Sequence, residues 1–456
     1  MTQSVSLRVR RPPGPKIRFP RTVWQGMLNV LPLLEAMASE YGDIAYLDAG
    51  HLSFYFVNDP DLIRDILVTH GHQFTKSRAL EMSKLVLGEG LLTSEGAVHR
   101  RQRRCLQPAF RWQCQQHYAA TIIGCVEHMR QSWRPGQIVD IHHEMMELSL
   151  AIVAQAVLSA DVTGEASEIR RAVNTLVSMF RYAMLPGAEF LAHLPLPMTR
   201  RFWQARQRLR DTIARIIEQH RDAAVGNAAN GQADLVSMLL AAQGEADTRM
   251  TDEQIRDEII TIFLAGQETT ANALSFTWYL LAQYPEVETQ MHAEVDAVLG
   301  GRVPTWEDLP QLSYVEAVVA ESMRLYPPAF ALGRCARADY QLREYCVPAG
   351  STILMSQWVM HRDVRYYAEP LRFDPGRWLR ESCAARPKFA YFPFGGGHRV
   401  CIGEALAWME GVLVLATLAQ LWQPRLTSHA PLKLQPLITL RPKGGIKMRL
   451  EARPRP

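Results

Sequence analysis

The pattern of hydrophobic and polar positions predicts a mainly helical protein with a small mixed β region. Helical periodicity dominates from about residue 79 to residue 326. Short β-type runs lie on both sides of this region, at 44–47, 53–57, 352–355 and 438–440. Because these strands must pair across most of the chain, we expect residues 1–456 to form one large domain. Residues 1–16 are expected to be an extended N-terminal segment.

The longest helical pattern begins at Thr251 and ends near Pro285. Thr251 and Gln254 have the spacing of a capping box, and about 33 residues give a helix of roughly 50 Å. The apolar middle is interrupted by Ala-Gly-Gln-Glu-Thr-Thr at 265–270. Two interpretations are open. Gly266 could allow close helix packing while the threonine hydroxyls bond to the preceding turn, or the helix could open there over a bound group.

Composition excludes several classes of protein. The chain is 48% hydrophobic and 21% charged, as in ordinary globular proteins. With 50 Lys+Arg against 46 Asp+Glu, bulk charge does not favour nucleic acid, and we expect no nucleic-acid partner. Seven scattered cysteines with no Cys-x-x-Cys pair favour a reducing compartment over a disulfide framework. No apolar segment opens the chain, so we expect a cytoplasmic protein without a membrane anchor.

A glycine-rich loop with one cysteine comes directly before a strong helical pattern near the C-terminus. The spacing is Phe394-x-x-Gly397-x-Arg399-x-Cys401-x-Gly403, followed by Ala407 and Glu410. The positive end of the helix dipole favours a thiolate at Cys401, and the glycines let the backbone approach a flat group. A single thiolate with an open opposite face is how haem iron is held for O–O cleavage. The alternative is a structural cysteine beside a loop that merely needs glycine.

The whole pattern resembles the haem-ligand signature of the cytochrome P450 superfamily, and the resemblance runs from about Pro12 to Leu450. It implies the cytochrome P450 fold, mainly α with a small mixed β region. It also implies heme b (iron protoporphyrin IX) as the cofactor, with Cys401 as the iron ligand.

Glu268-Thr269 matches the acid–alcohol pair of that family. The resemblance implies that Thr269 donates a hydrogen bond to iron-bound oxygen and that Glu268 connects this site to solvent protons. Peroxide-using members and dehydrating synthases often lack the pair. The sequence therefore favours a monooxygenase that inserts one atom of O₂ into a C–H or C=C bond. The alternatives are a non-oxygenating haem-thiolate isomerase or dehydratase, and a haem-based sensor or carrier.

Two further motifs match the family and concern the protein frame around the cofactor. Glu321 and Arg324 form its ExxR pair, and Arg377 supplies the second arginine. The resemblance implies a buried triad that fixes the loop carrying Cys401. Gly376 and Trp378 depart from the Glu and Phe that are commoner in the family at those positions.

Haem propionates need cationic or hydrogen-bonding partners. His99, where many members have Trp, and Arg103 share one face of a predicted helix. Arg334 and Arg399 match two further family arginines. With Phe394 and Cys401, these residues form the expected cofactor-binding set. For each arginine alone, a solvated surface position is the alternative.

The chain has no spare segment for a flavin or an iron–sulfur cluster. We therefore expect electrons from a separate ferredoxin- or flavodoxin-type donor with its NAD(P)H-dependent reductase. Arg100, Arg101 and Arg104 could form a docking patch for an acidic donor, or merely a solvated helix face. The enzyme itself is expected to be a monomer.

The resemblance places substrate contacts at Ala265, Thr269, 74–92, 329–332 and 437–438, which are mostly apolar. A hydrophobic small molecule, such as a fatty acid, terpenoid, steroid or polyketide, fits them. Arg78 could hold a substrate carboxylate, but we interpret it as a surface residue. The stretch 181–187 is predicted to be a mobile lid joint. His142-His143-Glu144 is interpreted as polar surface.

Overall fold

The computed structural model describes most of the chain, which divides into two compact units. The described residues are 10–15, 30–48, 53–159, 171–173, 175–176, 194, 196–226, 235–241, 243, 250–379 and 385–453. Unit 1 consists of residues 1–81, 329–372 and 385–401, and unit 2 of residues 82–328, 373–384 and 402–456. Each unit is assembled from segments that are distant in sequence. The predicted lid joint at 181–187 lies outside the described residues.

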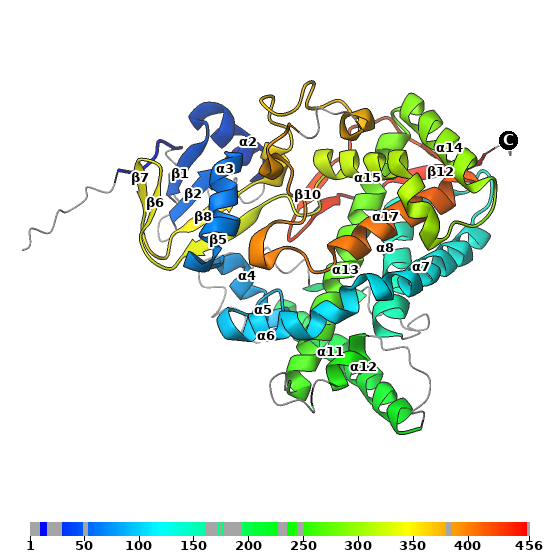
Figure 1. Ribbon diagram of the computed structural model, residues 1–456, viewed down its shortest axis with the longest axis horizontal. Coiled ribbons are helices and arrows are strands. Elements are labelled where there is room, and N and C mark those ends of the chain that lie inside the picture. The colour runs from blue at the N-terminus through cyan, green and yellow to red at the C-terminus, as the bar shows by residue number, and fades with distance from the viewer. Residues whose placement is uncertain are drawn as a thin grey trace, which may run out of the picture. The chain divides into compact units, whose positions relative to one another are not determined.

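Unit 1 is built around a five-stranded sheet in the order β1–β2–β8–β5–β3. Its elements are α2 (Val30–Tyr41), β1 (Ile44–Asp48), β2 (Ser53–Val57), α3 (Pro60–Arg64), the π-helix η1 (Asp65–Thr69), η2 (Gly71–Gln73), β3 (Phe74–Lys76), α4 (Arg78–Met82), β5 (Leu332–Ala336), β6 (Tyr340–Leu342), β7 (Tyr345–Val347), β8 (Thr352–Met355), α16 (Gln357–Met360), η8 (Lys388–Ala390) and η9 (Gly397–Arg399). Figure 1 shows α2 and α3 beside this sheet.

The sheet confirms the strands that the hydrophobic pattern predicted at 44–47, 53–57 and 352–355. β2 pairs antiparallel with β1 and parallel with β8, so that Phe56 lies between Ala45 and Leu354. Tyr55, Phe56 and Val57 are all buried, which is the pattern of a strand covered on both faces. The core on one side joins strand residues to those of α3 and η1.

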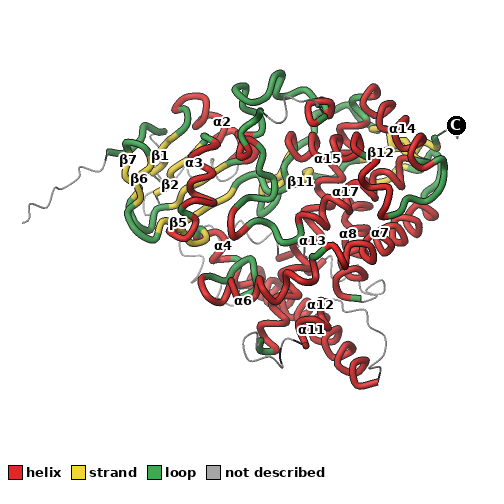
Figure 2. Tube along the Cα trace, in the orientation of Figure 1, coloured by secondary structure: helices red, strands yellow, loops and turns green. Residues whose placement is uncertain are grey.

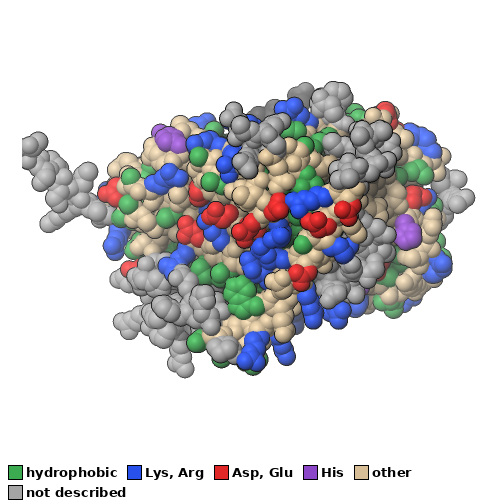
Figure 3. Space-filling view, turned by 90° about the horizontal axis from the view of Figure 1, so that it is seen from below, with side chains coloured by type: hydrophobic (Ala, Val, Ile, Leu, Met, Phe, Trp, Pro, Cys, Tyr) green, Lys and Arg blue, Asp and Glu red, His purple; other side chains and the backbone are tan. Residues whose placement is uncertain are grey.

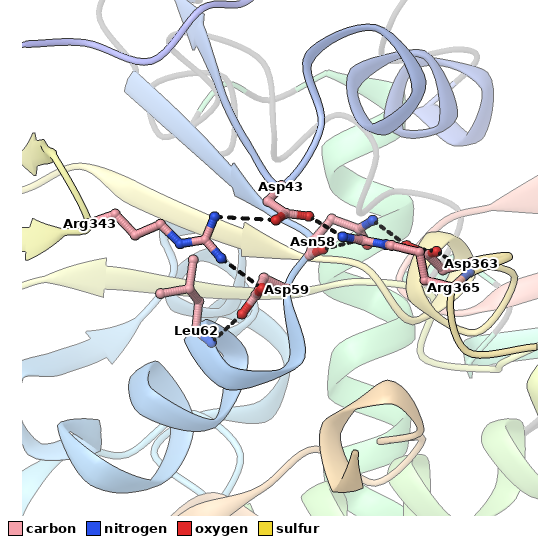
Figure 4. A network of polar contacts seen from close by, with 7 residues as sticks. All are labelled: Asp43, Asn58, Asp59, Leu62, Arg343, Asp363 and Arg365. Atoms are coloured by element: carbon pink, nitrogen blue, oxygen red, sulfur yellow. Dashed lines mark hydrogen bonds and ion pairs between the residues drawn. The ribbon is translucent and has the colours of Figure 1, made fainter. Parts of the chain in front are cut away.

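A network of ion pairs ties the beginning of unit 1 to its later segments (Figure 4). Arg343, in the turn after β6, reaches Asp59 at 2.8 Å and Asp43 at 3.3 Å. Arg365 reaches Asp43 and Asp363, both at 2.7 Å. Both arginines are partly exposed, so each pair contributes at most about 1 kcal/mol. Asp43 is shared, and one carboxylate therefore connects residues some 300 positions apart in the chain.

Unit 2 is mainly helical, with two small β-structures (Figure 2). Its elements are α5 (Lys84–Leu87), α6 (Gly96–Leu106), η3 (Gln107–Phe110), α7 (Trp112–Ser132), β4 (Ile138–Asp140), α8 (Ile141–Leu158), α11 (Pro197–Gly226), α12 (Leu235–Ala241), α13 (Asp252–Leu281), α14 (Pro285–Leu299), η5 (Trp306–Gln311), α15 (Ser313–Leu325), η6 (Pro375–Trp378), α17 (Glu404–Ala419), β9 (Trp422–Leu426), β10 (Leu434–Pro436), β11 (Leu440–Pro442) and β12 (Lys447–Ala452).

The long helix α13 forms the centre of unit 2 and packs against α8, α11, α15 and α17. The predicted capping box is confirmed, because Gln254 N donates to Thr251 Oγ1 at 3.2 Å and Thr251 N donates to Gln254 Oε1 at 3.0 Å. The helix ends at Leu281, a few residues before Pro285, which begins α14.

Gly266 marks a close approach of two helices. A Cβ added at Gly266 would lie 2.5 Å from Val153 Cγ2 of α8, closer than carbon atoms can approach. α13 is continuous through 265–270, so the predicted opening of the helix is wrong. The interpretation that Gly266 serves close packing is confirmed.

The β-structures of unit 2 are the sheet β4–β12–β9 and the hairpin β10–β11. The predicted strand at 438–440 is displaced by two residues, because Leu437 N donates to Thr439 O within the turn and β11 begins only at Leu440. Local β-propensity does not distinguish a turn from the strand that follows it.

The surface carries charges of both signs. On the face drawn in Figure 3, Lys and Arg side chains lie close to Asp and Glu side chains, in agreement with the nearly balanced composition. Of the helices that the structure describes, none combines the length and the apolar character needed to cross a membrane.

Candidate functional site

The loop before α17 folds back on itself and presents Cys401. Val400 N donates to Gly397 O, and Cys401 N donates to Phe394 O, each at 3.0 Å. Cys401 lies two residues before Gly403, the N-cap of α17, and is exposed. The first turns of α17 are also incompletely buried, whereas residues 409–419 are buried. The loop thus exposes a thiol ahead of a helix N-terminus, as predicted.

The glycines of this loop have a structural reason that the sequence did not reveal. Gly397 has φ +69°, and a Cβ there would lie 2.0 Å from Leu67 O of η1. A Cβ at Gly396 would lie 2.6 Å from the Phe389 ring. These glycines therefore let the loop pack against the protein's own backbone and core, and any larger residue would displace the segment that carries Cys401.

Glu321, which is fully buried, is the centre of a brace of hydrogen bonds. Its Oε1 accepts from Arg324 Nη2 and Arg377 Nε, both at 2.8 Å. Its Oε2 accepts from Arg324 Nε at 2.8 Å and from Trp378 Nε1 at 2.9 Å. Asp374 N adds a bond of 3.0 Å to Oε1. The predicted triad is therefore present, and Trp378 is a fourth side-chain member that sequence reasoning did not find.

His99 and Arg103 lie one turn apart on α6, as predicted. His99 is buried and Arg103 is half-buried, whereas Arg100 and Arg104 are exposed. α6 therefore has one face turned inward, with a histidine and an arginine on it. Arg100 and Arg104 are available to solvent, and Arg101 is half-buried.

Arg334 lies on β5 and is buried, with its Nη1 donating to Gly333 O at 3.0 Å. Its partner across the antiparallel ladder is Lys76 of β3, which is also buried. Two cationic side chains at paired positions point to the same face of a sheet, and their charges favour an anionic group beside them. Lys76 was not predicted, since nothing in the sequence pairs 76 with 334. Phe394 and Arg399 are half-buried in the cysteine loop.

One stripe of α13 is uncovered although the middle of the helix is otherwise almost entirely buried. Ala265 is exposed and Thr269, one turn later, is half-buried. Thr269 Oγ1 donates to Ala265 O at 2.7 Å. The back-bonded threonine of the packing interpretation is therefore present. The uncovered stripe also leaves room for a bound group against Ala265 and Thr269.

Glu268 faces away from solvent. Its carboxylate is buried and accepts hydrogen bonds from Thr439 Oγ1 and Arg441 Nε. The carboxylate is thus directed to these two partners within the protein, and the role of Glu268 in proton delivery stays a prediction. Its partners are 171 and 173 residues away, on the β10–β11 hairpin and strand β11, and no local pattern could have indicated them.

His142, which was interpreted as polar surface, is instead largely buried against α13. Its Nε2 lies 3.0 Å from Asn272 Oδ1, and burial lowers the pKa of His142. The neighbouring His143 is about half exposed, as expected for adjacent positions on a helix.

These observations fit a haem group. Cys401 offers an exposed thiol, and α13 offers an uncovered stripe with a hydroxyl. Lys76 and Arg334 offer paired buried cations of the kind that carboxylates require.

Comparisons with known proteins agree. The family model described as Cytochrome P450 matches residues 12–448. The chain is 37% identical to cyclooctatin synthase of Streptomyces melanosporofaciens, over 91% of this chain and 89% of that protein. It is 34% identical to cyclooctat-9-en-7-ol 5-monooxygenase of the same organism, over 90% and 88% of the two chains. It is 33% identical to pentalenene oxygenase of Streptomyces avermitilis, over 94% of both.

A solved structure, the cytochrome P450DA heme domain, has the same fold, with a TM-score of 0.85, 24% identity and 98% coverage of both chains. The chain belongs to the cytochrome P450 family. It is a monooxygenase of that family, and membership implies a haem cofactor.

Proposed function

We propose that this enzyme inserts one atom of O₂ into a C–H or C=C bond of a neutral, hydrophobic small molecule. The observation that carries the proposal is the uncovered stripe of α13, where a hydroxyl at Thr269 follows the small apolar side chain of Ala265. This arrangement supports oxygenation because it combines space for an apolar molecule with a hydrogen-bond donor.

The cofactor in this proposal is heme b, which when bound supplies the oxidising chemistry. Cys401 is its thiolate ligand, and Phe394 packs against it. Cationic and imidazole side chains hold its propionates: His99, Arg103, Arg334 and Arg399, with Lys76 added by its buried position beside Arg334. Their role is binding and orientation.

Thr269 moves or holds a proton in this proposal. A hydroxyl has one donor hydrogen and two acceptor lone pairs, so Oγ1 can accept from a water molecule while it donates. In the structure its hydrogen is directed to Ala265 O. Rotation about one side-chain bond redirects the hydrogen into the space above Ala265, which requires no change in the backbone of α13.

For the substrate we propose a cyclic terpenoid-type molecule whose functional groups are limited to an alkene and an alcohol. Two relatives are named for cyclooctat-9-en-7-ol and pentalenene, whose endings denote an alkene and, in the first, an alcohol. In unit 2 the predicted contact residues Leu92, Ala265 and Ile438 are apolar and exposed. Ile438 adjoins Thr439, which bonds to α13 through Glu268, so this apolar turn lies close to the uncovered stripe.

For the electron donor we propose a ferredoxin- or flavodoxin-type protein with its NAD(P)H-dependent reductase. The exposed positions of Arg100 and Arg104 on α6 support an acidic donor, because opposite charges speed encounter and fix its orientation. We expect a monomeric, cytoplasmic enzyme.

The test is the pair Thr269→Ala and Thr269→Ser, assayed with pentalenene and cyclooctat-9-en-7-ol and a surrogate ferredoxin and reductase. Removing the hydroxyl is expected to lower product formation about tenfold or more while NAD(P)H oxidation continues and peroxide accumulates. Ser retains a hydroxyl and should preserve most of the product.

Turnover of wild-type protein and Thr269→Ala at equal rates would favour the isomerase or dehydratase alternative. Haem binding with no NAD(P)H-driven product from any substrate tried would favour a sensor or carrier.

A further inference from the structure

A chain of buried hydrogen bonds connects Glu268 of α13 to the β10–β11 hairpin and to α8. Thr439 Oγ1 and Arg441 Nε donate to Glu268 Oε1. Asn272 Nδ2 donates to Thr439 Oγ1 at 3.2 Å, and His142 Nε2 lies 3.0 Å from Asn272 Oδ1. Glu268, Asn272, Thr439 and Arg441 are all buried.

The direction of every bond in this chain is determined. The amide oxygen of Asn272 can only accept, so the imidazole Nε2 of His142 donates to it. Asn272 then donates to Thr439, and Thr439 donates to Glu268. A primary amide neither gains nor loses a proton near neutral pH. The chain therefore orients the carboxylate rather than conducting protons to it.

The bonds to Glu268 also hold the β10–β11 hairpin in place. β10 and β11 pair through residues 434–436 and 440–442, and Lys443 N adds a bond to Lys433 O at 2.7 Å. A two-stranded hairpin of this length is marginal by itself. Leu440 N donates to Pro328 O at 2.9 Å, which ties one point of β11 to the segment after α15. The bonds to Glu268 are charge-assisted and buried, so they are the strongest anchors among those described for the turn.

We propose that Thr439 and Arg441 are positioning residues for Glu268, and that the β10–β11 hairpin and the Glu268 carboxylate form one latch. Opening the hairpin releases the carboxylate, and losing the carboxylate loosens the hairpin. The consequence for turnover rests on the proposed function and on the prediction from the sequence that Glu268 serves proton delivery beside Thr269.

Amide hydrogen exchange in the holoenzyme tests the latch without reference to turnover. Thr439→Val removes the hydroxyl at nearly constant shape, Thr439→Ser retains it, and Glu268→Gln removes the charge. We expect exchange of the amides in 434–442 to accelerate roughly ten- to hundredfold in Thr439→Val and in Glu268→Gln. Thr439→Ser should remain close to wild type. Thr417→Val is the matched control, since Thr417 Oγ1 is also buried but donates to Leu413 O within its own helix α17, at 2.6 Å.

Turnover provides the second readout, as peroxide released per NAD(P)H consumed with the same surrogate donor. Thr439→Val should raise the peroxide fraction several-fold, and Thr439→Ser should restore it. Equal behaviour of the Val and Ser variants, or unchanged exchange of 434–442 in Glu268→Gln, would overturn the latch. If the wild-type protein lacks the thiolate-type haem spectrum, the proposed function is contradicted. The hydrogen-exchange rates of 434–442 then test the latch on their own.

Discussion

Glu410 of α17 is a carboxyl group in a fully buried position. Ser149 Oγ of α8 donates to its Oε1 at 2.8 Å, and burial raises the pKa of Glu410 to about 8. Because the ordinary pKa is 4.5, the folded protein keeps a proton that the unfolded chain loses. The free energy of unfolding therefore falls as the pH rises from about 4.5 to about 8. Glu410 does not lower it below that range, where the side chain is protonated in both the folded and the unfolded state.

Glu410→Gln is expected to remove this pH dependence. Glutamine keeps the carbonyl oxygen that accepts from Ser149, and it cannot ionise. The variant should match wild type near pH 5 and exceed it by an amount on the order of a few kcal/mol at pH 8 to 9. Urea unfolding at several pH values measures the difference. Parallel pH profiles for the two proteins would show that Glu410 does not titrate in this range.

Residues with local signals were predictable, and residues with distant partners were not. Glu321 and Arg324 share a helix face, so their pairing follows from spacing. Trp378 was noted only as a departure from the commoner Phe, yet its indole N–H completes the set of donors around Glu321. The same limit applies to Lys76, whose significance depends on a ladder partner far along the chain.

At the scale of elements, the crossing of α13 and α8 is set by Gly266. The side chain of Val153 occupies the space where a Cβ would stand. Close packing leaves no volume for an added methyl group, so the helices must separate or Val153 must change rotamer if one is introduced.

Gly266→Ala is expected to destabilise the protein by about 1–3 kcal/mol, and Val153→Ala in the same chain should recover part of that loss. The matched control is Gly124→Ala in α7, where nothing lies within 4 Å of an added Cβ. There the higher helix propensity of alanine should stabilise by up to about 1 kcal/mol. Denaturant unfolding of the four proteins measures these effects. If both Gly266→Ala and Gly124→Ala destabilise the protein by the same amount, the contact with Val153 is not the cause of the effect at Gly266.

The same contrast explains which elements the sequence could predict. The start of α13 was predicted because a capping box is complete within four residues. The sequence left two interpretations of residues 265–270 open, because the choice between them depends on Val153 of another helix. The start of β11 was misplaced because the turn before it is stabilised both by its own bond from Leu437 N to Thr439 O and by Glu268, which is distant in sequence.

At the scale of the whole molecule, each compact unit contains some of the predicted site residues. Unit 1 contains Cys401 and Arg334, and unit 2 contains His99, Arg103 and Thr269. The family could be predicted from the cysteine loop, because its spacing is local and every position is filled. The geometry around Glu268 could not, because α13, α8 and the β10–β11 hairpin all contribute to it.

We propose that Cys401 is the thiolate ligand of a haem, and the ferrous–CO difference spectrum of the purified protein tests this role most directly. Cys401→Ser removes the thiol, and Cys346→Ser in β7 is the control for losing a partly buried cysteine elsewhere. We predict a strongly red-shifted Soret band in wild type and in Cys346→Ser, and its loss in Cys401→Ser. A band that survives in Cys401→Ser, or well-folded wild-type protein that takes up no haem when haem is supplied, would contradict the account.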